Sequence, residues 1–134
     1  MKLTLHLLTC NEPSPYTGRV YPLEEVKKMV EKYNERNIDY PTVGVLVQET
    51  EEYCADMPLY HISHVTNSLY IDKTSLMANI TLLLTHAGEV VKNNLDALRL
   101  SPAMSGNFNN MNCIHDLTLI RTDFLFKQEV PEGY

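Results

Sequence analysis

The sequence of 134 residues has no long apolar run and only five scattered glycines. No stretch approaches the roughly 20 apolar residues that a membrane-spanning helix needs. Residues 1–8 are apolar but alternating, and they are too short and too polar for a signal peptide. We therefore expect no targeting or membrane segment. The scattered glycines provide neither a phosphate-binding loop nor a G-x-S-x-G nucleophile motif.

Cysteine is also scarce. Cys10, Cys54 and Cys113 are an odd set without CxxC or zinc-finger spacing. This pattern favours reduced thiols in a protein made in the cytoplasm over a disulfide framework. Basic residues are outnumbered by acidic ones, 11 to 17, which gives a net charge of −6. We therefore expect no binding to nucleic acid or to an anionic membrane, and a basic protein surface is the more suitable partner.

The length fits one domain, which we predict over residues 1–134. Strands are predicted where apolar and polar residues alternate, at residues 3–8, 42–47, 59–84 (with a turn at 72–74), 101–108 and 114–127.

Two helices are predicted between these strands. Pro22 suits the first turn of a helix, and the apolar residues that follow recur at helical spacing as far as residues 34–37: Leu23, Val26, Val30 and Tyr33. Thr85 suits the N-cap of a second helix from His86 to about Leu98, with three inward residues, Val91, Leu95 and Leu98. The pattern indicates a β-rich α+β domain.

Two histidines three residues apart, His61 and His64, could chelate a metal ion on a helix. The surrounding pattern is that of a strand, where residues three apart point to opposite faces, and no third ligand lies nearby. We therefore predict structural histidines, with no metal and no cofactor. Ser63, Ser101 and Ser105 could in principle pair with a histidine, but composition alone selects no catalytic pair.

The most specific pattern is Gly18-Arg19-Val20-Tyr21-Pro22, which leads directly into the first predicted helix. It resembles the N-x-x-G-R-x-Y-P loop of the phage prohead (capsid-maturation) serine protease family, with Pro15 in place of the asparagine. Residues 62–66 resemble the V-S-H-V-I strand of that family. Residues 80–88 and 100–106 resemble two later segments, in the same order.

The resemblance covers residues 3–127. The family shares its fold with herpesvirus assemblin. The resemblance therefore implies an α+β, β-rich domain built on a single closed or partly open, mainly antiparallel β-barrel with two flanking helices.

The chain departs from this family at the catalytic positions. The family histidine lies in a G-E-L-x-H-P segment, and the corresponding residues 44–49 place Gln48 there. A glutamine amide cannot act as a general base near neutral pH. The family nucleophile lies in a G-V-S-S-R-G segment, and alignment on Gly106 places Ala103 and Met104 at its two serines. Neither side chain has a hydroxyl, so the resemblance implies a degenerate member without protease activity.

These departures predict a structural role in the virion, as a capsid decoration or cement protein or a minor head component. The expected partners are the major capsid protein or another virion protein of the connector or tail, and a homo-oligomer is a further option. The alternative is a divergent active serine protease that cleaves capsid or scaffold precursors. It would use Ser105 or Ser101 as nucleophile and His61 or His64 as base. A regulatory or host-derived binding domain unrelated to capsids is a third hypothesis.

Overall fold

The computed structural model defines residues 1–37, 42–47 and 61–127. No helix within these residues is long and apolar enough to cross a membrane. The elements follow one another as β1 (Lys2–Thr9), α1 (Leu23–Asn37), β2 (Thr42–Val45), β3 (Ile62–Asp72), β4 (Ser75–Leu82), α2 (His86–Asn93), the 3-10 turn η2 (Leu95–Ala97), β5 (Leu98–Asn109) and β6 (Asn112–Phe126).

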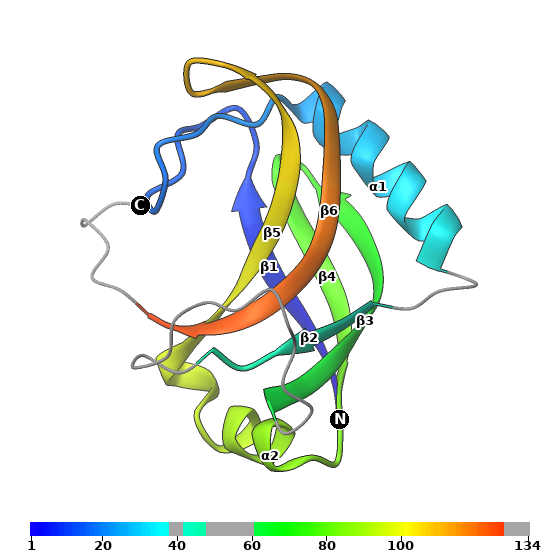
Figure 1. The fold of residues 1–134 in the computed structure, drawn as a ribbon, viewed down its shortest axis with the longest axis vertical. Helices are drawn as coiled ribbons and strands as arrows, with labels where there is room; N and C mark the ends of the chain where they lie inside the picture. Colours follow the sequence, from blue (N-terminus) through cyan, green and yellow to red (C-terminus); the bar gives the residue numbers. More distant parts are fainter. Residues whose placement is uncertain (38–41, 48–60, 128–134) are drawn as a thin grey trace.

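The described strands form two antiparallel sheets (Figure 1). The larger sheet has the order β1-β4-β3-β2, and β5 and β6 form a long two-stranded ribbon. The sheets meet where β6 crosses the end of β2. There Leu46 forms a parallel bridge with Phe124, and the Val47 amide donates to the Phe124 carbonyl at 3.0 Å. The expected mostly-β fold with two helices is present, but the described strands form two sheets that are not closed into a barrel, so the expected closed or partly open barrel is not confirmed.

β4 shows the alternation that its sequence predicts. Leu76, Ala78 and Ile80 on one face are wholly buried. The side chains between them, such as Met77 and Asn79, are only partly buried on the outer face. The core therefore lies on one side of the larger sheet, beneath α1 and the ribbon.

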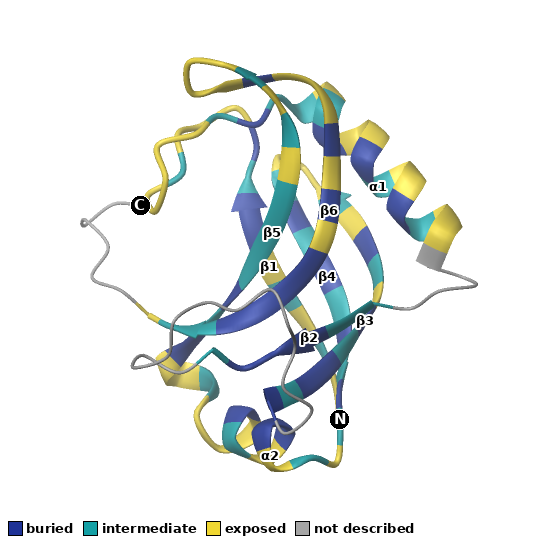
Figure 2. Cartoon of the chain, in the orientation of Figure 1, coloured by how far each residue is buried: buried dark blue, intermediate teal, exposed yellow. Residues whose placement is uncertain are grey.

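The buried face of α1 is rotated slightly from the predicted one. Val26 and Tyr33 are buried as expected, but Met29 is buried in place of Val30, which is half-buried like Leu23. The reason is that α1 packs against β6 and β3 together, so its inward stripe follows the i, i+3, i+7 positions. Figure 2 shows the buried residues of α1 on its side toward β6 and the exposed ones on its outer side.

α2 begins as predicted and ends earlier. Thr85 is the N-cap, and its hydroxyl accepts from the Gly88 amide at 3.0 Å. The helix ends at Asn93 instead of near Leu98, and β5 begins at Leu98. The prediction was wrong because Leu98 and Leu100 bury their side chains at strand spacing, opposite the phenylalanines of β6.

The loop over residues 18–22 fastens the tip of the ribbon to the start of α1. The Val20 amide donates to the Met111 carbonyl at 2.7 Å. The Arg19 guanidinium lies 4.7 Å from the centre of the Phe108 ring, so a cation–π contact adds to the hydrogen bond. This loop therefore has a structural role in the fold.

The cysteines that the structure describes, Cys10 and Cys113, are free and buried. Burial raises the pKa of the Cys10 thiol to about 11, which keeps it protonated and unreactive at neutral pH. Cys54 lies outside the described residues.

Candidate functional site

A buried polar cluster lies where β3 faces β6. Ser63, His64 and Thr66 of β3 and Thr122 of β6 are each at most 1% exposed. The two ring nitrogens of His64 both have hydroxyl partners: Nδ1 lies 2.8 Å from Ser63 Oγ, and Nε2 lies 2.9 Å from Thr122 Oγ1. Thr122 Oγ1 also lies 2.8 Å from Thr66 Oγ1. The His64 ring thus links the larger sheet to the ribbon.

Burial determines the charge of His64. Because the ring is removed from water, its pKa is lowered from 6.5 to about 4, and a hydrogen bond with the Thr122 backbone opposes the shift. Each ring nitrogen has a hydroxyl partner, and a hydroxyl can donate or accept, so both tautomers of the neutral ring are satisfied. His64 is therefore neutral at pH 7.

Gly44 of β2 makes room for this cluster. A Cβ atom at this position would lie 2.0 Å from the Thr122 carbonyl oxygen and 2.3 Å from His64 Cε1. Such distances are far inside van der Waals contact, so the backbone of β2 can approach both partners only because residue 44 has no side chain.

A buried ion pair continues the cluster along β6. Asp123 Oδ2 accepts from Arg121 Nε at 2.9 Å, and both side chains are buried. The other oxygen, Oδ1, accepts from the Val45 amide of β2 at 3.1 Å. One carboxylate therefore neutralises a buried guanidinium and also holds the end of β2. We refer to Gly44, Ser63, His64, Thr66 and residues 121–124 together as the polar seam.

The polar seam contains the one serine–histidine contact that the described residues form. A hydroxyl that donates to a neutral imidazole is the geometry from which a nucleophile is activated. Ser63 and His64 are, however, both 0% exposed. A substrate carbonyl must come within about 3 Å of the attacking oxygen, and no path from solvent leads there in this conformation. The contact lies within β3, and the two sheets are joined by the other ring nitrogen of His64, which contacts Thr122 of β6.

The positions that the resemblance assigns to the family nucleophile lie on β5. In the register with β6, Ala103 pairs with Arg121 and Met104 with Leu119. Their serine neighbours are the alternative nucleophiles: Ser101 pairs with Asp123, and Ser105, which is exposed, pairs with Thr118.

The candidate bases are not joined to these serines. Within residues 61–127 no hydrogen bond connects Ser101 or Ser105 to His61 or His64, and both nitrogens of His64 are occupied by other partners. His61 is buried just before β3, and its carbonyl accepts from the Leu46 amide at 2.9 Å. The position assigned to the family histidine, Gln48, lies outside the described residues.

The structure brings no third metal ligand to His61 and His64 within the described residues. No three histidine, cysteine, aspartate or glutamate side chains gather within the part of the chain that the structure describes. His64 directs both ring nitrogens to hydroxyl groups.

Three members of the polar seam were missed by the sequence interpretation: Thr122, Arg121 and Asp123. Residues 121–123 are consecutive polar residues, whereas strand segments covered on both faces are usually apolar runs, so nothing in the sequence marked this segment as buried.

The sequence matches no protein-family model and no curated protein sequence. The structure is similar to that of the bacteriophage T4 capsid assembly protease, gp21, with a TM-score of 0.67 and 12% sequence identity. The match covers 95% of this chain and 82% of that chain. This likeness shows the fold: the chain has a prohead-protease-like architecture, mostly β with two helices, as the loop at residues 18–22 predicts.

Proposed function

We propose that the protein is a catalytically inactive protease fold that serves as a structural component of a phage particle, as a capsid decoration or cement protein or a minor head protein. The observation that carries the proposal is the fold, which matches that of the bacteriophage T4 capsid assembly protease over 95% of the chain. A retained fold without its reactive groups suits a binding role.

The absence of proteolysis is supported by the side chains at the assigned positions. Ala103 and Met104 offer no nucleophile, and neither neighbouring serine is bonded to a described histidine. The assigned general-base position carries Gln48. His64 is enclosed between the two sheets, where it has a stabilising role.

The partners that we propose are the major capsid protein or a connector or tail protein, with a homo-oligomer as a further arrangement. The protein would be made in the host cytoplasm and then reside in the virion. The net charge of −6 argues against packaged nucleic acid as the main partner.

Quantitative mass spectrometry of purified particles tests this role. We expect the full-length, uncleaved chain at a stoichiometric ratio to the major capsid protein. Complete absence from mature particles would contradict the proposal, because a decoration or head protein remains with the capsid.

The alternative is an active serine protease that processes capsid or scaffold precursors, and the likeness to a protease favours it. A fluorophosphonate probe, which labels activated serines, distinguishes the two. We expect no labelling of the purified protein and no cleavage of co-expressed capsid or scaffold precursors. Labelling that is lost in Ser105→Ala or Ser101→Ala would establish the protease instead.

A further inference from the structure

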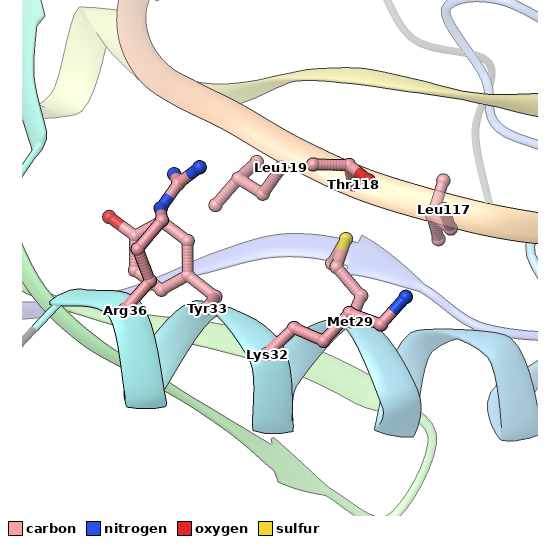
Figure 3. Close-up of a pocket in the computed structure, with 7 residues that line it drawn as sticks. All are labelled: Met29, Lys32, Tyr33, Arg36, Leu117, Thr118 and Leu119. Carbon is pink, nitrogen blue, oxygen red and sulfur yellow. The ribbon is translucent and has the colours of Figure 1, made fainter.

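A groove separates α1 from the first half of β6 (Figure 3). Its floor is apolar, since Met29 of α1 and Leu117 and Leu119 of β6 contribute buried side chains. The volume of about 230 Å³ is below the roughly 300–1,000 Å³ of pockets that enclose drug-sized ligands. The groove therefore suits one or two side chains of a docked polypeptide.

The rim of the groove on α1 is positively charged. Lys32 and Arg36 are exposed and line the groove, with the Arg36 guanidinium 5.9 Å from the centre of the Tyr33 ring (Figure 3). Neither cation forms an ion pair with a carboxylate of the described residues. Both charges therefore remain available to a ligand.

These two cations extend an ordered row along the helix. Lys28, Lys32 and Arg36 follow one another at intervals of four residues, so they share one side of α1 at a rise of about 6 Å per step. Lys28 pairs with Glu25 at 3.4 Å, which leaves the positive charge concentrated over the groove. We call these three residues the basic stripe.

One carboxylate of β6 lies within electrostatic range of the stripe. The hydrogen bond from His115 is the main cause of the lowered pKa of Asp116, and the charge of Lys32 contributes. The Asp116 carboxylate is held by His115 at 2.8 Å and by Asn107 at 3.2 Å. It is hydrogen-bonded at the ribbon and attracts Lys32 from a distance, but it forms no ion pair with Lys32 or Arg36.

From this arrangement we infer that the groove between α1 and β6 binds an acidic peptide segment of a partner protein. An apolar side chain of the segment enters the groove above the buried Met29, Leu117 and Leu119, beside the exposed Thr118, and its carboxylates face Lys32 and Arg36. The inference goes beyond the proposed function, because it names a surface and a ligand chemistry and holds wherever the chain resides.

The net charge of −6 predicts a basic partner, whereas the ligand inferred for the groove is acidic. The difference arises because salt screens charges beyond about 8 Å at physiological ionic strength. The charged side chains that line the groove are Lys32 and Arg36, so these two cations act most directly on a ligand at contact distance. An apolar floor beside two cations also favours a peptide with mixed side chains over a phosphate backbone, which would need a broad basic surface.

Fluorescence anisotropy with the purified full chain tests the inference. The probe is a fluorescein-labelled decapeptide with one leucine flanked on each side by two glutamates, in a glycine–serine background. We expect binding that weakens about fivefold or more in Lys32→Glu and in Arg36→Glu, since each reversal replaces an attraction by a repulsion of about 1 kcal/mol or more. The same peptide with glutamines in place of glutamates is expected to bind at least about fivefold more weakly.

Lys27→Glu is the matched control. It makes the same charge change on the same helix, but Lys27 lies outside the groove and pairs with Glu24 at 3.6 Å. We expect its affinity for the glutamate peptide to stay within about twofold of the wild type. Thr118→Trp fills the mouth of the groove from the exposed side of β6 without changing the charge, and we expect it to abolish binding. Thermal unfolding of each variant verifies that it is folded.

Three results would overturn the inference: no binding of the glutamate peptide at millimolar protein, equal binding of the glutamine peptide, or equal losses in Lys27→Glu and Lys32→Glu. Self-association of the wild type that Lys32→Glu abolishes would also overturn it, since the occupant would then be a second copy. These failures differ from failure of the proposed function. A chain that is absent from particles can still bind the peptide, and a chain that fails to bind it can still be a particle component.

Discussion

β6 contacts the rest of the molecule in two different ways along its length. Over residues 121–124 it is buried on both faces, and polar groups join it to β2 and β3. Earlier in the strand, alternate apolar residues at Leu117 and Leu119 pack toward α1, while Thr118 between them stays exposed. The polar seam is closed and fixes how the two sheets align, whereas the groove is open and keeps unpaired charge at its rim. Stability is therefore expected to depend on the seam, and binding on the groove.

The strongest disruption of the seam is expected from Gly44→Ala. The new methyl group would meet the Thr122 carbonyl oxygen at 2.0 Å, and a backbone atom cannot move aside cheaply. We expect a loss of about 3 kcal/mol or more in the free energy of unfolding, measured by urea denaturation. Gly18→Ala is the control: its φ of 76° carries a backbone cost of about 1 kcal/mol, but a Cβ there meets nothing within 4 Å. Equal losses in the two variants would contradict the close packing of the seam.

Acid is expected to weaken the seam through His64. The pKa of the folded state, about 4, lies below the usual 6.5, so the unfolded chain takes up a proton first as the pH falls. The stabilisation is complete above pH 6.5 and is lost as the pH falls to about 4, a change on the order of 3 kcal/mol. Urea denaturation between pH 7 and pH 4 measures it.

His64→Gln tests the assignment of this pH dependence. We expect a less stable protein at pH 7 with a much flatter pH profile, in which His6, whose pKa is also lowered by burial, leaves a residual slope of the same sign. His86→Gln, at an exposed position, retains His64 and should retain the wild-type profile. An unchanged slope in His64→Gln would assign the acid sensitivity to other groups.

A smaller loss is expected from Thr122→Val, which keeps the shape of the side chain and removes its hydroxyl. His64 Nε2 and Thr66 Oγ1 each lose a buried partner, so we expect a loss of about 2 kcal/mol in the free energy of unfolding. The same change at Thr118, on the exposed part of the strand, should cost less than about 0.5 kcal/mol. Similar values at the two positions would remove the contrast between seam and groove.

The smallest effect on stability is expected at the basic stripe. Lys32→Glu and Arg36→Glu each change an exposed charge that forms no ion pair with the described residues. We therefore expect the free energy of unfolding, measured by thermal denaturation, to change by no more than about 0.5 kcal/mol. A larger loss of stability would mean that the basic stripe also stabilises the fold. It would contradict the expectation that stability depends on the polar seam and binding on the groove.

Local chemistry made part of the fold predictable. The alternation in β4, the cap at Thr85 and the helix that follows Pro22 are encoded by neighbouring residues, and each is confirmed. The end of α2 was wrong because Leu98 fits a helical spacing and a strand equally well, and only its pairing with Phe126 decides between them.

The polar seam was less predictable, because its contacts join distant residues. His64 and Thr122 are 58 residues apart, and nothing beside either residue specifies the other. Gly44 appeared only as part of a segment that resembles a family motif, and its role depends on a backbone that approaches from β6. The loss of catalysis stays a prediction, since one of its assigned positions, Gln48, lies outside the described residues.

The position of β6 as the last of the described strands has a consequence for synthesis. All four strands of the larger sheet have been synthesised once residue 82 has emerged from the ribosome. Ser63 and His64 are then present, but the β6 residues that bury them are not. The partners of His64 on β6, Thr122 and Phe124, arrive some forty residues later. At the usual elongation rate of about 5–20 residues per second, this leaves an exposed intermediate for a few seconds. The protein is thus expected to complete its fold only as translation reaches the end of the ribbon.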